Sequence, residues 1–229
     1  MQTIGVIGGI SPQATMDFEV RVHVVAQRLI PQRGNSGYPP LIVHYLRQPP
    51  VAIGDDFLAL RPLRPSAALL SAARGLGALA DFLVITANGP HQLRAAIEGA
   101  AGCPILSMVD LTLDAVQERG WRRVGVLGLG EPHVYLGPLA ERGIATVTLD
   151  ADDRGRLDGA IIRLMEGRAG AEERAAAAGA IATLRARAVD GIIPGCTEIP
   201  LLLGAASDAP DLINPAQLLA EAAVRRAMA

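Results

Sequence analysis

Short apolar runs alternate along the chain with longer segments that have helical periodicity. An apolar run without polar alternation is typical of a strand buried on both faces. The predicted strands are Ile4–Gly8, Leu41–Leu46, Phe82–Thr86, Pro104–Met108, Arg123–Gly128, Ala145–Leu149, Gly191–Pro194 and Leu212–Asn214. The predicted helices are Gln13–Leu29, Ser66–Leu79, Pro90–Ala100, Leu111–Arg119, Val134–Arg142, Gly155–Glu166, Ala171–Ala188 and Pro215–Ala227. This alternation predicts an α/β protein with parallel sheets covered by helices on both faces.

The chain repeats two of its patterns in the same order. Residues 3–9 (TIGVIGG) resemble residues 123–129 (RVGVLGL), and residues 80–88 (ADFLVITAN) resemble residues 189–197 (VDGIIPGCT). The repetition predicts two pseudo-symmetric halves, and ligands of parallel sheets bind beyond the carboxyl ends of the strands. If the halves face one another, Ala87 and Cys196 would lie at equivalent positions on opposite sides of one cleft.

Composition excludes several classes of protein. The net charge is −2, and no block of like charge occurs, which argues against nucleic-acid binding. All 21 basic residues are Arg. A chain without Lys can form neither the Schiff base of a pyridoxal phosphate enzyme nor a Walker-type phosphate site. The start of the chain carries no export signal, and no apolar run is long enough to span a membrane, so we expect a cytoplasmic protein.

Cysteine is the strongest candidate for chemistry. Cys103 and Cys196 form no disulfide framework, and no His/Cys spacing suits a metal. Cys196 follows a predicted strand and precedes Thr197 and Glu198, where a helix N-terminus would favour the thiolate. The alternative is an ordinary buried cysteine. Cys103 opens an apolar segment without polar companions, and we interpret it as structural.

Four motifs together resemble the aspartate/glutamate racemase superfamily, in its aspartate-racemase-like branch. Residues 3–15 (TIGVIGGISPQAT) are similar to the family's opening TIGxxGGMGPxAT, and residues 80–91 are similar to ADFxxxPCNTAH. Residues 104–108 (PILSM) match PIxSM, and residues 195–199 (GCTEI) match the GCTEI signature. The motifs lie in register over nearly the whole chain.

The resemblance implies a fold and a chemistry. The fold would be two pseudo-symmetric, flavodoxin-like α/β domains, which we place at residues 1–110 plus 208–229 and at residues 111–207, with the active site in the cleft between them. The family's racemases use no cofactor, and they commonly form dimers. Two cysteines flank the substrate α-carbon, and each removes or returns the proton on one face.

The chain departs from the family pattern at the first cysteine. The resemblance places that cysteine at position 87, where this chain has Ala87. Thr86, Gly89 and Pro90 also replace the family's residues, whereas Asn88 and His91 remain, so these last two are candidate substrate-binding residues.

Three further departures concern the binding of a substrate carboxylate. The family's substrate-binding Arg corresponds to Arg47 only with a shifted alignment, and a family Lys corresponds to Arg168. The family's Thr-Gly-Thr loop is replaced by residues 129–133 (LGEPH), in which Glu131 would repel a carboxylate. We expect Arg47 and Arg168 to bind the substrate's negative charge.

The remaining candidates are polar groups at the predicted strand ends. Ser11 and Gln13 could donate hydrogen bonds to a substrate carboxylate, and an N-cap role is equally open for Ser11. Thr197 and Glu198 flank the Cys196 thiol, and Glu198 could cap the helix or poise the thiol.

These observations leave three functions open for a small anionic substrate, in a protein expected to be a homodimer. The first is a modified racemase with Cys196 as one acid/base. The second is an enzyme of the same superfamily that needs a single thiol, such as a decarboxylase or an isomerase. Arylmalonate decarboxylase resembles such an enzyme in having one essential cysteine. The third is an inactive paralogue that binds a small acid.

Overall fold

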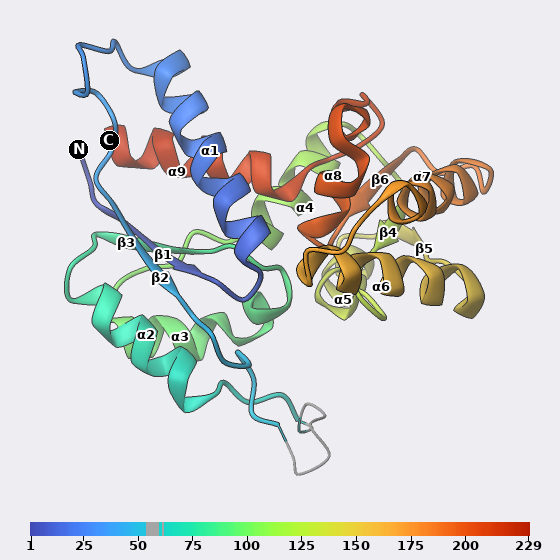
Figure 1. Ribbon diagram of the computed structural model, residues 1–229, viewed down its shortest axis with the longest axis horizontal. Coiled ribbons are helices and arrows are strands. Elements are labelled where there is room, and N and C mark those ends of the chain that lie inside the picture. Colours follow the sequence, from blue (N-terminus) through green and yellow to red (C-terminus); the bar gives the residue numbers. More distant parts are fainter. Residues whose placement is uncertain (54–59, 61) are drawn as a thin grey trace. The chain divides into compact units, whose positions relative to one another are not determined.

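The computed structural model describes residues 1–53, 60 and 62–229 and divides the chain into two compact units (Figure 1). Unit 1 comprises Met1–Met108 and Ala216–Ala229, and unit 2 comprises Val109–Pro215. Each unit contains a three-stranded parallel sheet with helices packed around it. The predicted α/β class with parallel sheets is therefore confirmed.

Unit 1 is built around a sheet of strand order β2-β1-β3. Ile4 at the start of β1 pairs with Leu41 of β2 and with Phe82 of β3. Helices α1 and α9 lie together on one side of this sheet, and α2 and α3 lie on the other (Figure 1). Its elements are β1 (Ile4–Gly8), α1 (Pro12–Leu29), β2 (Leu41–Tyr45), α2 (Ala67–Gly77), β3 (Phe82–Ile85), η1 (Gly89–Leu93), α3 (Arg94–Ala101) and α9 (Pro215–Met228).

Unit 2 repeats this topology with the strand order β5-β4-β6. The first strand of each unit is central, and the last strand pairs with it on one side; in unit 2, Leu127 of β4 pairs with Pro194 of β6. Its elements are α4 (Met108–Glu118), β4 (Arg123–Leu127), α5 (His133–Glu141), β5 (Ala145–Val147), α6 (Ala151–Met165), α7 (Ala171–Arg185), β6 (Gly191–Pro194), α8 (Glu198–Leu203) and η2 (Gly204–Asp208).

The strands predicted at Pro104–Met108 and Leu212–Asn214 are wrong. Each segment touches its sheet through a single parallel bridge, Ile105 to Leu83 and Leu212 to Ile192. A proline at the start of the first segment has no N–H to donate to a ladder, and helix α4 begins at the end of that segment. The second segment runs directly into α9. Residues 208–215 belong to unit 2, because Ile213 N–H donates to the Ile192 carbonyl at 3.0 Å.

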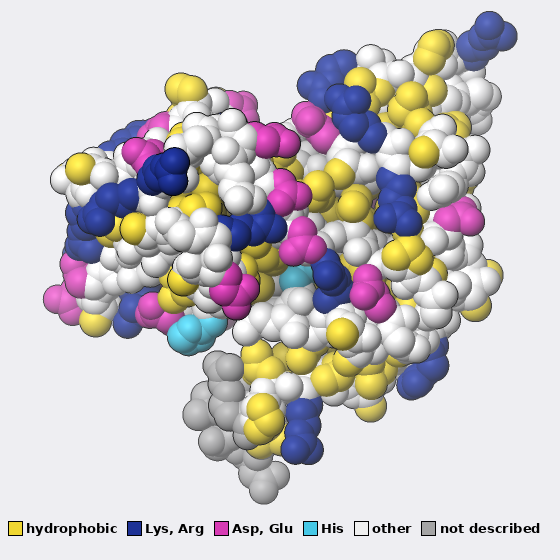
Figure 2. All heavy atoms as spheres, turned by 180° about the vertical axis from the view of Figure 1, so that it is seen from behind, with side chains coloured by type: hydrophobic (Ala, Val, Ile, Leu, Met, Phe, Trp, Pro, Cys, Tyr) yellow, Lys and Arg dark blue, Asp and Glu magenta, His cyan; other side chains and the backbone are white. Residues whose placement is uncertain are grey.

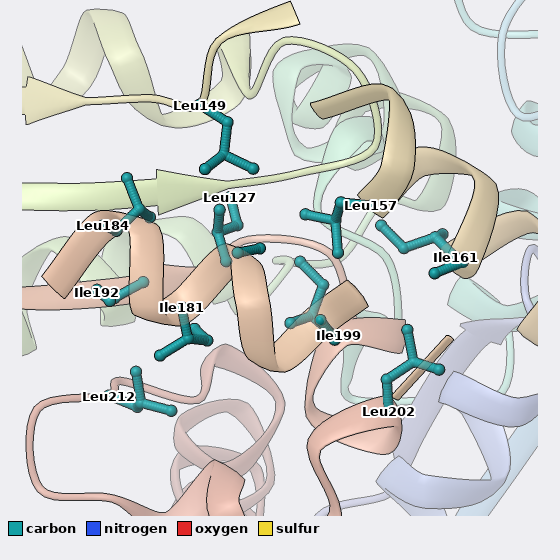
Figure 3. Close-up of a cluster of buried hydrophobic side chains, with 13 residues drawn as sticks. Leu127, Leu149, Leu157, Ile161, Ile181, Leu184, Ile192, Ile199, Leu202 and Leu212 are labelled. Carbon is teal, nitrogen blue, oxygen red and sulfur yellow. The ribbon is translucent and has the colours of Figure 1, made fainter. Parts of the chain in front are cut away.

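An aliphatic cluster holds the helices of unit 2 against its sheet (Figure 3). Leu127 of β4, Leu157 of α6 and Ile181 of α7 meet in it, and each is at most 3% exposed. Ile199 and Leu202 fix the short helix α8 to the same cluster, and Cys196 packs against it. Burial of each such side chain stabilises the fold by about 1.5–3 kcal/mol, so the segment carrying Cys196 is firmly held.

The surface carries mixed charge. On the face shown in Figure 2, Arg side chains are interspersed with Asp and Glu side chains. Many are paired, as Arg185 is with Asp211 at 2.7 Å and Arg142 with Asp114 at 2.7 Å. Within the described ranges, none of the helices is both long and apolar enough to cross a membrane.

Candidate active site

The turn after β6 brings Cys196 beside the end of β4. Gly195 N–H donates to the Leu127 carbonyl at 2.9 Å. A Cβ atom at Gly195 would lie 2.7 Å from that carbonyl oxygen and 2.9 Å from the Tyr135 ring. Only glycine allows this close approach, and it sets the Cys196 backbone at the carboxyl edge of the sheet.

Cys196, Thr197 and Glu198 form a hydrogen-bonded cluster at this edge. The Cys196 thiol donates to Glu198 Oε2 at 2.9 Å, and the Thr197 hydroxyl donates to the same oxygen at 3.1 Å. Glu198 is only 1% exposed, and its Oε1 has no hydrogen-bond partner among the residues that the structure describes. Cys196 as a whole residue is half-buried. A carboxylate is therefore placed to take the thiol proton directly.

Burial raises the pKa of the Cys196 thiol well above its usual range, and the negative charge and hydrogen bond of Glu198 raise that pKa further. Backbone N–H groups of Glu198 and Leu129 lower the pKa by hydrogen bonding to the sulfur, but they do not outweigh burial. The resting site therefore holds a protonated thiol at neutral pH, together with donors that stabilise a thiolate once it forms.

We expect Glu198→Gln to lower the pH at which Cys196 becomes reactive. Only the thiolate is alkylated, so the iodoacetamide rate of the native site should rise with an inflection above pH ~8.5, the ordinary thiol pKa. The glutamine removes the negative charge but keeps the side chain's size, so the inflection should move to lower pH. Alkylation is measured by mass spectrometry in a Cys103→Ser background, which leaves Cys196 as the single thiol. An unchanged inflection would contradict the assigned role of Glu198.

The same pKa shift makes stability depend on pH. The unfolded chain loses the Cys196 proton near pH ~8.5, whereas the folded chain keeps it to higher pH. The free energy of unfolding should therefore fall as the pH rises above this value, and Cys196→Ser should reduce the fall.

The loop after β4 replaces the expected carboxylate-binding loop with a different set of contacts. Glu131 is exposed, and its Oε2 lies 2.8 Å from the Arg154 guanidinium. Gly130 N–H donates to Asp158 Oδ1 at 2.8 Å. Leu129 is 45% exposed. The Glu131 charge is thus compensated locally, which the sequence did not indicate.

The end of β3 in unit 1 lacks an ionisable group at position 87. Thr15 Oγ1 accepts from Gly9 N–H at 2.8 Å and donates to the Ser11 carbonyl at 3.0 Å. Its single proton is thereby used, so Thr86, 2.9 Å away, must donate to it. The Thr86 hydroxyl proton is committed to this buried contact, and the neighbouring Ala87 is half-buried.

The other predicted residues are distributed over both units. Ser11 is the N-cap of α1, accepting from Ala14 N–H at 3.5 Å, and its hydroxyl donates to Gln13 Oε1 at 3.5 Å. Asn88 and His91 are buried around the start of η1. The structure thus groups Ser11 with Gln13, and Cys196 with Thr197 and Glu198.

The two predicted arginines are exposed. Arg47 follows β2, and its guanidinium lies 4.9 Å from the centre of the Tyr45 ring. Arg168 lies between α6 and α7 and forms an ion pair with Glu166. Their role with a substrate carboxylate stays a prediction. Cys103 packs against the apolar cluster of unit 1.

Sequence reasoning missed the supporting contacts of Thr15, Asp158 and Arg154. Thr15 could have been found, since it lies one helical turn after Ser11 in the opening motif. Asp158 and Arg154 reach the loop from 28 and 23 residues away, a distance over which sequence spacing gives no signal. Among the described residues, no three His, Cys, Asp or Glu side chains group as metal ligands.

Two repeated parallel-sheet units, with a hydrogen-bonded thiol–carboxylate pair at the end of one strand, define an α/β protein with a candidate site at that strand end. The chain belongs to the Asp/Glu/Hydantoin racemase family, whose model matches residues 7–223.

Solved structures share this fold. A candidate Asp/Glu racemase from Yersinia pestis is 26% identical, with both chains covered to 100% and a TM-score of 0.76. The Picrophilus torridus aspartate racemase is 20% identical over 100% of this chain and 95% of its own, with a TM-score of 0.77. An aspartate racemase homologue from Pyrococcus horikoshii OT3 is 20% identical over 100% of both chains, with a TM-score of 0.75. The last two likenesses show the fold alone.

Proposed function

We propose that this chain is a cofactor-independent, amino-acid-racemase-like enzyme in which Cys196 moves a proton at the α-carbon of a small carboxylic acid. The observation that carries the proposal is the 2.9 Å contact between the Cys196 thiol and Glu198 Oε2. Membership of the racemase family supports it.

The contacts of Cys196 suit both directions of proton transfer. As a base, the thiol first passes its proton to Glu198 Oε2, and the thiolate then takes the proton from the substrate α-carbon. As an acid, the neutral thiol gives its proton to an α-carbanion, and the resulting thiolate is held by the N–H groups of Glu198 and Leu129. A well-placed acid/base group contributes about 10²–10⁴-fold to the rate.

The state of the β3 end favours a second candidate, chemistry with a single thiol. Ala87 has no ionisable group, and Thr86 donates its proton to Thr15. A decarboxylase or isomerase would need protonation on one face only. In a decarboxylation, the C–CO₂⁻ bond breaks, its electron pair stays on the α-carbon as CO₂ leaves, and the Cys196 thiol supplies the proton.

Hydrogen exchange in D₂O tests the proposal. The enzyme is incubated with D- and L-amino acids, and loss of the α-hydrogen is followed by ¹H NMR while chiral chromatography follows inversion. We expect α-hydrogen exchange whose rate Cys196→Ser lowers at least about 100-fold. Exchange with inversion supports racemisation, and exchange without inversion supports one-thiol chemistry.

A parallel incubation covers the second candidate. A substituted malonate can lose CO₂ without first losing an α-hydrogen. Release of CO₂ together with formation of the monocarboxylic acid would therefore identify a decarboxylase. If neither exchange nor CO₂ release depends on Cys196, the proposed enzyme function is wrong and the inactive small-acid-binding protein becomes the better explanation.

A further inference from the structure

The loop after β4 is the nearest neighbour of the Cys196 turn along the sheet edge. Leu127 of β4 pairs with Pro194 of β6, so Leu129 and Cys196 each stand two residues beyond a paired position. The Leu129 N–H group also lowers the pKa of the Cys196 thiol, against the larger effect of burial. A substrate whose α-carbon is at the thiol must therefore meet what this loop presents.

The loop's groups for binding an anion are already occupied by the chain's own carboxylates. Gly130 N–H donates to Asp158 Oδ1 at 2.8 Å, and the Arg154 guanidinium holds Glu131 at 2.8 Å. Two acidic side chains, Asp158 and Glu131, thus contact this loop, and the Arg154 guanidinium is paired with the second of them. A second substrate carboxylate would have to displace one of them or accept like-charge repulsion.

Leu129 presents an apolar surface instead. Its side chain is 45% exposed, whereas Leu127 in the same segment is 1% exposed. Contact with a substrate's apolar group would remove both surfaces from water, which is favourable in proportion to the area buried.

We infer that Leu129 is a specificity-determining residue. It selects a substrate that has one carboxylate on its α-carbon and an apolar side chain, over a substrate whose side chain carries a second carboxylate. This inference rests on the proposed function for the position of the substrate. The Asp158–Gly130 and Arg154–Glu131 contacts reinforce the selection by keeping the loop closed to a second anion.

Leucine and aspartate form a matched pair of probes, because their side chains differ by an isopropyl group in place of a carboxylate of similar shape. Binding is measured by calorimetry to Cys196→Ser, which keeps the site without turnover, and exchange is measured in D₂O with the wild type. We expect leucine to bind at least about tenfold more tightly than aspartate. Leu129→Thr in the same background should reduce this ratio by about tenfold.

Leu79→Thr is the matched control. Leu79 is 65% exposed but precedes β3, at the opposite end of the strand from Ala87, so its replacement should leave the ratio unchanged. Aspartate binding as tightly as leucine, or neither amino acid binding, overturns the inference. Preferential binding of leucine that depends on Leu129 supports it even where exchange is undetectable, in which case the proposed function alone fails.

Discussion

Replacing Cys196 by serine should lower kcat at least about 100-fold, because a placed acid/base group contributes about 10²–10⁴-fold and a serine hydroxyl is a far weaker acid than a thiol. The hydroxyl is slightly smaller than the thiol and can still donate to Glu198 Oε2, so the cluster with Thr197 should persist. The loss should therefore fall on kcat, and KM should change only a few-fold. Steady-state kinetics of α-hydrogen exchange measure both constants.

Cys103→Ser provides the control for this result. Cys103 is half-buried against the apolar cluster of unit 1, and no carboxylate among the described residues is hydrogen bonded to its thiol. Its replacement should keep activity within a few-fold. Circular dichroism and thermal unfolding establish that both variants fold. Full activity in a protein alkylated at Cys196 would refute the catalytic assignment.

The sequence predicts the strands within each sheet well, but it predicts poorly which further segments join the edge of a sheet. The bounds of Ile4–Gly8 and Gly191–Pro194 agree with the structure because both strands are fully buried and are therefore continuous apolar runs. Pro104–Met108 and Leu212–Asn214 are also mainly apolar, yet each forms one bridge. Whether an apolar segment extends a sheet depends on where the following helix begins, and local hydrophobicity does not encode that position.

The candidate site divides in the same way. Cys196, Thr197 and Glu198 are consecutive, so their proximity follows from the motif itself. For Ser11 the sequence allowed a cap or a ligand, and the structure shows the cap. The pairing of Glu131 with Arg154 joins residues that the sequence separates, and it gives the Glu131 carboxylate a partner that the sequence did not indicate. Side-chain pairing between separate elements is the part that sequence reasoning could not supply.

Ala87→Cys should make racemisation appear, or increase it by about tenfold or more, because inversion needs an acid and a base on opposite faces of one carbon. Ala87 follows β3 as Cys196 follows β6, and β3 and β6 occupy equivalent places in their sheets. The alanine is half-buried and leads into Asn88, as Cys196 leads into Thr197. A neutral thiol fits this position without adding charge to the resting protein.

The loop after β4 should determine for which amino acid the Ala87→Cys variant racemises faster. With Leu129 present, the increase should be visible with leucine and weak with aspartate. Adding Leu129→Thr and Glu131→Thr to Ala87→Cys frees Arg154 from its ion pair and supplies two hydroxyl groups, so the gain should then extend to aspartate. The double variant without Ala87→Cys is the control, and it should bind aspartate without racemising it faster than the wild type.

Chiral chromatography of leucine and aspartate distinguishes these outcomes. Inversion of leucine by Ala87→Cys, and of both amino acids by the triple variant, would establish the equivalence of the two strand ends in catalysis. A folded triple variant that inverts neither amino acid would show that position 87 does not act on the carbon that Cys196 serves. In that case, Cys196 with Glu198 must work as a single thiol, and the search for substrate moves to acids that need protonation on one face only.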